Sequence, residues 1–159
     1  MRKILIPTDF TVESLQLVEY AVINYPDNNL DIILIAGYRL SHSYWGIRHF
    51  NEKEQVYSQV SNQFIESKRR LELEHNNIIG RISIRLFTGA NSLAFKNFVE
   101  YLEVRDAIVP KYGLQCAAKN WFDTTTYLKK NLQNVVEVVM GQPKEVQETK
   151  ILIKKPVQV

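Results

Sequence analysis

The sequence contains very little cysteine and no long hydrophobic run. Cys116 is the only cysteine among 159 residues, so the chain cannot form a disulfide within itself, which favours an intracellular protein. No apolar segment approaches the roughly 20 residues that a membrane-spanning helix needs. The amino terminus does not read as a signal peptide, because Asp9 interrupts its apolar run after a few residues. We therefore expect a cytoplasmic protein that does not bind membranes.

A strong charge of one sign is also missing. The chain carries 20 Lys and Arg against 17 Asp and Glu, and this net charge of +3 is too weak to indicate a nucleic-acid-binding protein. Its one basic cluster, residues 68–70, lies in a strongly charged helical segment and is typical of a solvated helix face. An apolar fraction of 45% and a length of 159 residues indicate one ordinary globular domain.

Motifs for catalysis and for metal binding are absent. We find no Ser, His and Asp in a catalytic order and no paired-carboxylate spacing, so no catalytic residue is named and we expect a non-enzymatic protein. His42 and His49 flank Trp45 without carboxylate or cysteine companions, which does not fit a metal site. Cys116 has no evident base beside it, which favours an inert thiol over a nucleophile.

The first ten residues read as a buried strand that runs into a turn and a helix. Residues 4–6 form an apolar run without polar alternation, as expected of a strand covered on both faces. Pro7 ends the strand because proline has no N–H for the ladder. Thr8, Asp9 and Thr11 then offer oxygens where a helix needs caps. Ligands of open α/β sheets bind beyond the carboxyl ends of such strands, so Asp9 lies where a site would be.

Strand and helix patterns alternate along the rest of the chain. Further strands are predicted at residues 31–36, 82–86, 107–109 and 135–140, and helices at 15–25, 52–75, 92–102 and 124–132. This alternation predicts βαβ units in a five-stranded, doubly wound parallel sheet with helices on both faces. The α/β domain spans residues 1–141, and residues 111–122 within it look irregular. The tail, residues 142–159, holds one more β-like run at 151–153.

The order of these elements, together with ILIPTDF at residues 4–10, resembles the universal stress protein family. The segment KILIPTDFTVESLQLVEYAV resembles the family's opening strand and helix, including Asp9. The segment FTGANSLAFKNFVEYLEVRDAIV resembles its third strand, third helix and fourth strand, including Gly89 and Asp106, and VVEVV resembles its last strand. The resemblance covers residues 3–140. It implies the adenine nucleotide alpha-hydrolase-like three-layer sandwich with strand order 3-2-1-4-5.

The glycine-rich ATP-binding motif of the family is missing. Nucleotide-binding members carry G-x2-G-x9-G-S/T after the fourth strand, where glycines admit the phosphates and a helix start binds anions. The corresponding positions here hold Lys111, Leu114, Thr124 and Thr125. All three glycines are replaced and only Thr125 fits, while Asp123 would place a negative charge beside any phosphate. The resemblance therefore implies a divergent member that does not bind ATP.

A vestigial nucleotide cleft would still gather six residues at the strand ends. They are Pro7, Thr8, Asp9, Gly37, Lys111 and Thr125. Asp9 would contact the base or ribose, although a helix-capping role needs no ligand and is favoured because the phosphate half is missing. Lys111 would offer a point charge to an anion, although a solvated lysine at a strand end is more common.

Aromatic residues gather in the loop after the second strand. They are Tyr38, Tyr44, Trp45 and Phe50. Such a loop beside the carboxyl edge of the sheet would line a pocket, dock a protein partner, or cover the apolar cleft left by the missing nucleotide. The sequence leaves these alternatives open.

The last predicted strand is a hydrophobic edge in the family's strand order. Its apolar residues are Val135, Val136, Val138 and Val139. An exposed edge of this kind invites pairing with another chain, so we expect a homodimer through this strand. The competing outcome is that the run at 151–153 covers the edge within the chain.

The function predicted from these observations is a non-enzymatic, universal-stress-protein-like module without a cofactor, which acts as a homodimer through protein contacts. The alternative is a sensor of a nucleotide, such as ATP or AMP, or of another small ligand. It would use the cleft at the carboxyl ends of the first and fourth strands. A hydrolase or transferase on the same scaffold is a third class, because a fold does not fix a function.

Overall fold

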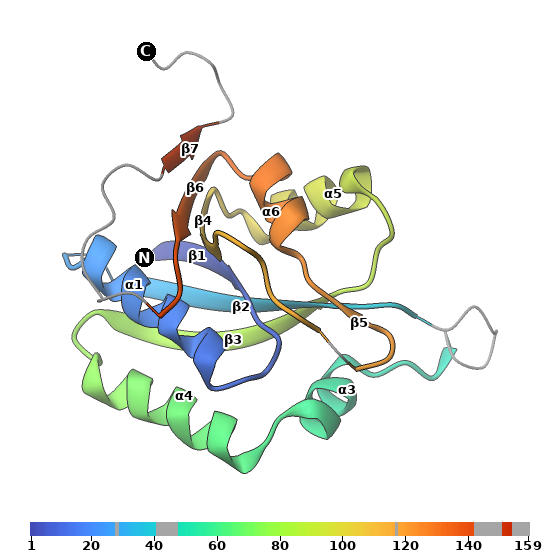
Figure 1. Cartoon of the computed structure of the whole chain (residues 1–159), viewed down its shortest axis with the longest axis horizontal. Helices are drawn as coiled ribbons and strands as arrows, with labels where there is room; N and C mark the ends of the chain where they lie inside the picture. The colour runs from blue at the N-terminus through green and yellow to red at the C-terminus, as the bar shows by residue number, and fades with distance from the viewer. Residues whose placement is uncertain (28, 41–47, 117, 142–150, 154–159) are drawn as a thin grey trace.

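The computed structural model describes residues 1–27, 29–40, 48–116, 118–141 and 151–153, the last three by their backbone alone. The strands are β1 (Arg2–Pro7), β2 (Leu30–Tyr38), β3 (Ile79–Phe87), β4 (Asp106–Pro110), β5 (Trp121–Phe122), β6 (Asn134–Val138) and β7 (Ile151–Ile153). The helices are the 3-10 turn η1 (Glu13–Leu15), α1 (Gln16–Asn24), α3 (Glu52–Gln59), α4 (Asn62–Glu74), α5 (Ser92–Leu102) and α6 (Thr125–Asn131), arranged as in Figure 1. Within the described ranges, no helix is long and apolar enough to cross a membrane.

The sheet has the predicted order with two additions. Its strands run β3-β2-β1-β4-β6-β7, and the first five are parallel, so the predicted order 3-2-1-4-5 is confirmed with β6 as the fifth strand. The additions are short antiparallel strands, β7 on β6 and β5 on the end of β2. The segment at 111–122 is therefore not irregular throughout, because Trp121 and Phe122 pair with Tyr38 and Gly37.

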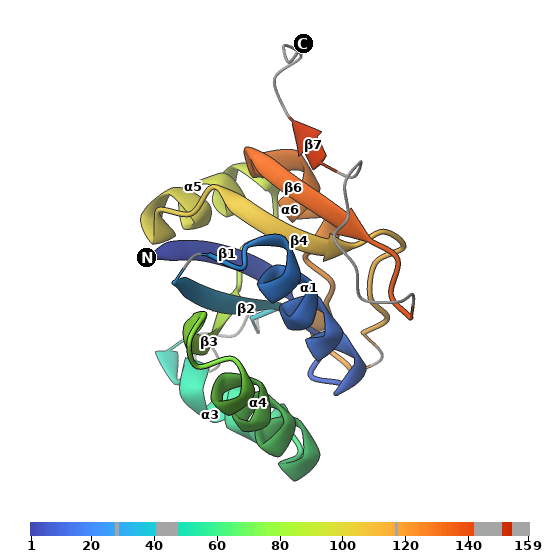
Figure 2. The same cartoon turned by 90° about the vertical axis from the view of Figure 1, so that its left-hand side faces the viewer.

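Helices cover both faces of the sheet and make three layers (Figure 2). Ile4 and Ile6 pack into the core cluster that holds the buried side chains of α1 and α4. Leu5, which points the other way in β1, packs with the buried side chains of α5 and α6. All three are fully buried. The apolar run at residues 4–6 therefore has the physical cause predicted for it: the strand has a helical layer on either side.

The prediction of one long helix over residues 52–75 is wrong. Val60 and Ser61 are extended, and they separate α3 from α4. Ser61 caps the second helix, because its side-chain oxygen accepts the N–H of Phe64 at 3.1 Å. The apolar stripe continues across this break, which is why helical periodicity alone did not reveal it.

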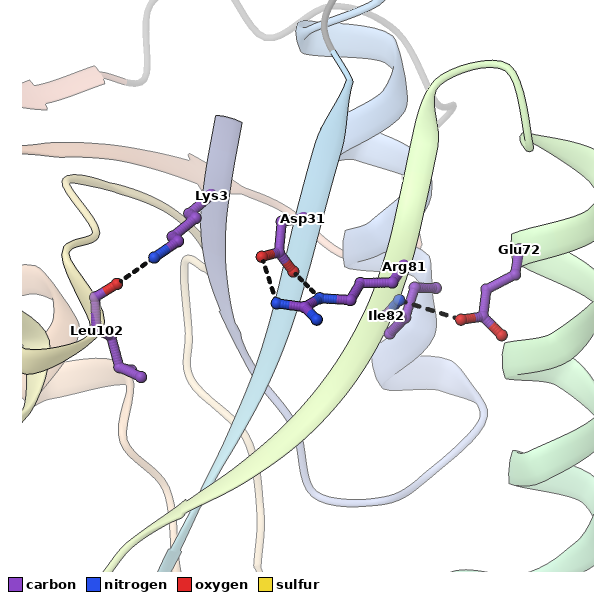
Figure 3. Close-up of polar contacts among 6 residues, drawn as sticks. All are labelled: Lys3, Asp31, Glu72, Arg81, Ile82 and Leu102. Atoms are coloured by element: carbon purple, nitrogen blue, oxygen red, sulfur yellow. Dashed lines mark hydrogen bonds and ion pairs between the residues drawn. The ribbon is translucent and has the colours of Figure 1, made fainter. Parts of the chain in front are cut away.

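Both long edges of the sheet are covered by other parts of the same chain. On β3, the Glu72 carboxylate accepts the N–H of Ile82 at 3.1 Å (Figure 3), and the Glu52 carboxylate accepts the N–H of Leu86 at 3.0 Å. On the other side, β7 pairs with residues 134–136 of β6. The run at 151–153 thus docks as an extra strand, the outcome that competes with a dimer at this edge.

The side chains of β6 lie in the core of the monomer. Val135, Val136 and Val138 are at most 3% exposed, and Val139 is half-buried. Val135, Val136 and Val138 belong to a strand with a helix layer on each face, so they point into those layers and backbone groups face the sheet edge, whereas Val139 follows the strand.

The amino ends of the strands carry ion pairs. Arg81 donates two hydrogen bonds of 3.1 Å to the buried Asp31 carboxylate, and Lys3 Nζ donates to the Leu102 carbonyl at 2.8 Å (Figure 3). Arg2 donates to both oxygens of Asp106, at 3.1 and 3.2 Å. Every one of these contacts ties a strand to its neighbour or to the helix layer.

Candidate functional site

The turn after β1 is held together by its own side chains. Asp9 Oδ1 accepts the N–H of Thr11 at 3.1 Å and its hydroxyl at 2.5 Å. Thr11 Oγ1 in turn accepts the N–H of Ser14, at the start of η1. Asp9 therefore stabilises the turn, and Thr11 does the capping that the sequence favoured for Asp9. The other oxygen of Asp9 is not used by this turn.

Thr8 and Phe10 set the direction of this turn. The buried Thr8 hydroxyl oxygen accepts the N–H of Phe10 at 3.0 Å, and it lies 3.0 Å from the Ser14 hydroxyl. Phe10 has a φ of 65°, a left-handed conformation that a phenylalanine rarely adopts. This conformation puts its ring against the ring of Trp121, with the centroids 5.1 Å apart.

Strand β5 covers the end of β2, where the sequence placed an open cleft. Phe122 lies against the α-carbon of Gly37, and a β-carbon at position 37 would overlap its ring. Gly37 is thus a packing glycine, which accepts a close approach by the chain's own aromatic residue. The guanidinium of Arg39 lies over the ring of Phe122, 5.0 Å from the ring centroid.

The aromatic residues of the second loop join the same cluster where the structure describes them. Tyr38 lies edge-on to Trp121 at 4.8 Å and stacks on Phe50 at 5.8 Å between centroids. Tyr44 and Trp45, like His42, lie outside the described residues. Tyr38 and Phe50 therefore pack over the strand ends, one of the three roles that the sequence left open.

At the start of α6, the carboxylate of Asp123 accepts hydrogen bonds from neighbouring donors. The Asp123 carboxylate accepts the N–H of Thr125 at 3.0 Å, the Thr125 hydroxyl at 2.7 Å and the N–H of Leu114 at 2.9 Å. Leu114 and Thr125 are two of the four positions that the resemblance aligns with the family's glycine-rich motif. Lys111 is exposed, and its ammonium lies 5.6 Å from the ring of Tyr112.

A cavity of about 280 Å³ lies between these elements, at the carboxyl ends of β1 and β2. Its walls come from the turn at residues 8–11, from Gln59 at the end of α3, from Gln115 and Cys116 in the loop after β4, and from both residues of β5. Of the six predicted site residues, Thr8 and Asp9 line this cavity. The other four do not line it: Pro7 ends β1, Gly37 lies in β2, Lys111 follows β4 and Thr125 begins α6.

Sequence reasoning missed the residues that close this cavity. Trp121 and Phe122 lie in a stretch without periodicity, and only their β-forming side chains hinted at a strand. Gln59 and Gln115 carry no motif and reach the cavity only through the break after α3 and the course of the loop after β4.

The thiol in the cavity wall is a poor nucleophile. Burial raises the pKa of Cys116 to about 11, and the negative charges of Asp123 and Asp9 add to the shift. The thiol is therefore protonated at neutral pH, in agreement with the predicted inert cysteine. Among the residues that the structure describes, no group of three or more His, Cys, Asp or Glu side chains could hold a metal ion.

The fold is found in known proteins. Among solved structures, the chain is similar to the universal stress protein UspA from Lactobacillus plantarum, with a TM-score of 0.54 and 12% identity over 87% of this chain and 97% of that one. A universal stress protein in complex with cAMP aligns over 88% of this chain and 98% of that one, at 15% identity and a TM-score of 0.48. No family model and no curated protein matches the sequence. The likeness to UspA shows that this chain has the universal stress protein fold.

Proposed function

We propose that this chain is a non-enzymatic, cytoplasmic module with the universal stress protein fold, that it does not bind ATP, and that it acts through protein contacts. The observation that carries the proposal is the Asp123 carboxylate at the start of α6. It takes up the backbone N–H groups of Leu114 and Thr125, which are the donors a phosphate group would need. A phosphate placed there would have to displace this carboxylate and would meet its charge.

Strand β5 supports the same proposal from the other half of the cleft. Phe122 fills the space beside Gly37, and Trp121 packs between Phe10 and Tyr38. These rings reduce the space at the ends of β1 and β2 to a cavity of about 280 Å³, just below the usual range for small-molecule sites of roughly 300–1,000 Å³. The protonated Cys116 thiol argues against a cysteine nucleophile in this cavity, and the cytoplasmic location is supported by Cys116 being the single cysteine.

Calorimetric titration with Mg-ATP tests the proposal. We expect no saturable heat at sub-millimolar ATP, and binding in the micromolar range would contradict the proposal. The Asp123→Asn variant separates the two obstacles, because it removes the charge and keeps one oxygen that can accept from Thr125. The N–H of Leu114, which bonds to the other carboxylate oxygen, loses its acceptor. If only this variant binds Mg-ATP, the Asp123 carboxylate prevents binding in the unaltered chain. If neither chain binds Mg-ATP, removal of the charge is not enough, and β5 is the remaining obstacle.

The proposed protein contacts include a second copy of the chain at the β6 edge. A sheet edge can pair with one strand at a time, so β7 and a second copy would compete for residues 134–136. Sedimentation of the full chain and of a chain ending at Gly141 measures this competition. We expect a larger dimer fraction for the shortened chain, and a monomer in both cases would contradict the homodimer.

A second candidate function is a sensor of a small ligand, and the cavity of about 280 Å³ at the ends of β1 and β2 favours it. Sites for small molecules lie most often at this edge of an α/β sheet. A ligand that binds only the folded chain raises its melting temperature, so a thermal-shift screen tests this candidate. ATP and AMP belong in that screen, because a shift with either would favour a nucleotide sensor over the first proposal.

A further inference from the structure

The cavity at the ends of β1 and β2 carries negative charge. Asp9 lines it and is half-buried, with Oδ1 bonded twice by Thr11. Within the described ranges, Asp9 Oδ2 has no hydrogen-bond partner, and none of the residues that line the cavity is positively charged. The pKa of the Cys116 thiol in the cavity wall is raised mainly by burial, and the negative charges of Asp123 and Asp9 add to the shift. A ligand in this cavity therefore meets an unneutralised carboxylate.

The remaining walls combine aromatic rings with amide groups. The rings belong to Trp121, Phe122 and Phe10, which offer apolar contact and π faces that attract cations. The amides belong to Gln59 and Gln115, and neither makes a hydrogen bond in the part of the chain that the structure describes. Their oxygens are free acceptors for the N–H groups of a ligand.

We propose that this cavity binds a small organic cation, which carries a primary ammonium or guanidinium group on an apolar body. The charged group would bond to Asp9 and to a glutamine oxygen, and the body would lie against Trp121 and Phe122. This proposal rests on the second candidate function, the small-ligand sensor, and names the class of its ligand. It does not depend on whether ATP binds.

Size and charge both distinguish this ligand from a nucleotide. A volume of about 280 Å³ is at the lower end of small-molecule sites, which span roughly 300–1,000 Å³. Phosphate groups would bring negative charge toward Asp9 and Asp123. A compact cation instead gains from both carboxylates, and the low-dielectric walls strengthen that attraction.

Three probes with the same aromatic body and different charges test the proposal by calorimetric titration of the full chain. They are 2-phenylethylamine, which is a cation at neutral pH, 2-phenylethanol, which is neutral, and 3-phenylpropionate, which is an anion. We expect saturable binding of the amine at about millimolar concentration or below, and at least tenfold weaker binding of the alcohol and the acid, because a hydrogen bond to a charged group is lost.

The Asp9→Asn variant removes the charge and keeps an oxygen for the Thr11 N–H and hydroxyl. We expect it to weaken binding of the amine about tenfold and to leave binding of the alcohol unchanged. Asp27→Asn is the matched control, since Asp27 is an exposed aspartate away from the cavity. A thermal melt of each variant confirms that it is folded. If Asp9→Asn does not fold, Trp121→Leu takes its place, with a weaker loss expected from the missing π face.

The proposal is overturned if the amine gives no saturable heat, if the alcohol or the acid binds as tightly, or if Asp9→Asn binds the amine like the unaltered chain. These outcomes leave the first function proposal standing, because they say nothing about ATP. Conversely, micromolar binding of Mg-ATP would overturn that first proposal whatever the amine does. The two failures are therefore distinguishable in one set of titrations.

Discussion

The carboxylates at the two ends of the parallel sheet differ in their hydrogen bonding. At the amino ends, Arg81 bonds both oxygens of Asp31, and Arg2 bonds both oxygens of Asp106. At the carboxyl ends, Asp9 uses one oxygen for a local turn, and the other has no partner among the described residues. A buried carboxylate with an arginine on both oxygens is a structural group, whereas a half-satisfied one at a cavity is available to a ligand.

The amino and carboxyl ends of the strands also differ in how closely side chains fill the space around the carboxylates. The amino ends are closed by side chains that cross from strand to strand, such as Arg2, which also lies 4.2 Å from the centroid of the Tyr25 ring. The carboxyl ends are covered by β5, which leaves a cavity beneath it. The described cavity with an incompletely bonded carboxylate thus lies at the end of the sheet where ligands of open α/β folds usually bind.

The largest loss of stability is expected when an ion pair at the amino ends of the strands is removed. Asp106→Ala removes both bonds from Arg2 and the 3.1 Å bond from Asn134 Nδ2, and it leaves a half-buried guanidinium without its partner. We expect a loss of about 3 kcal/mol in the free energy of unfolding, measured in urea. Asp27→Ala, at an exposed aspartate, is the control, and an equal effect of the two changes would contradict the contrast between the ends.

The next effect comes from opening the carboxyl end. Trp121→Ala removes a ring that packs on Phe10 and Tyr38 and forms part of the cavity wall. Because Trp121 is half-buried, we expect a loss of about 2 kcal/mol, below the usual cost of deleting a core tryptophan. Tyr112→Ala in the same loop, where the ring is 80% exposed, is the control. A loss for Trp121→Ala that is larger than the loss for Asp106→Ala would contradict the expected contrast, because the carboxyl end would then contribute more to stability than the amino end.

A smaller effect is expected from Arg81→Ala, also at the amino end. The change leaves Asp31 buried without its arginine, but Arg81 itself is 67% exposed, so water can reach part of the space it leaves. We therefore expect a measurable loss in urea unfolding that is smaller than those of Asp106→Ala and Trp121→Ala. Arg69→Ala on the exposed face of α4 is the control and should not change the free energy of unfolding. An equal loss for the two variants would mean that the ion pair of Arg81 with Asp31 contributes nothing to stability.

A last effect, which is absent at neutral pH, is a pH dependence at the carboxyl end. Folding raises the pKa of Cys116 from its ordinary value of 9.0 to about 11, so its contribution to stability is complete below pH 9.0 and is lost as the pH rises toward 11. We expect urea unfolding of the Cys116→Ser variant to be less sensitive to pH in this window. Alkylation by iodoacetamide gives a second measure: the folded chain should show a midpoint near pH 11, and a midpoint near 9.0 would show that the thiol is not in this environment.

Much of the fold could be predicted from local patterns. Residues 4–6 predicted a buried strand because they are apolar without alternation, and β1 is a central strand of the sheet. Local patterns of the same kind occur elsewhere: Ser83 and Arg85 alternate with the apolar residues of the edge strand β3, and the Asn91 side chain caps α5 by accepting the N–H of Ala94 at 2.8 Å. These features depend on neighbours within a few positions, so the sequence displays them directly.

The remaining features depend on contacts between distant positions. The break at Ser61 interrupts a helical stripe that is continuous in the sequence, and β5 forms only because Gly37 leaves room for the Phe122 ring. Asp123 was expected to repel a phosphate, but its bond to Leu114 required the path of the loop after β4. No periodicity encodes these pairings.

The sequence by itself determined the class of fold and, by resemblance, the order of its five parallel strands. It also determined that no glycine stands at the positions that the resemblance aligns with the family's glycine-rich motif. Burial patterns and turn residues act locally, and a missing glycine is missing in any conformation. Only the tertiary structure decided what lies in the cleft. Asp9, Gln59 and Trp121 are far apart in the chain, and packing brings them to one cavity, where none of the described lining residues is positively charged. Charge and shape at a site are sums over such neighbours, and they exist only once the chain has folded.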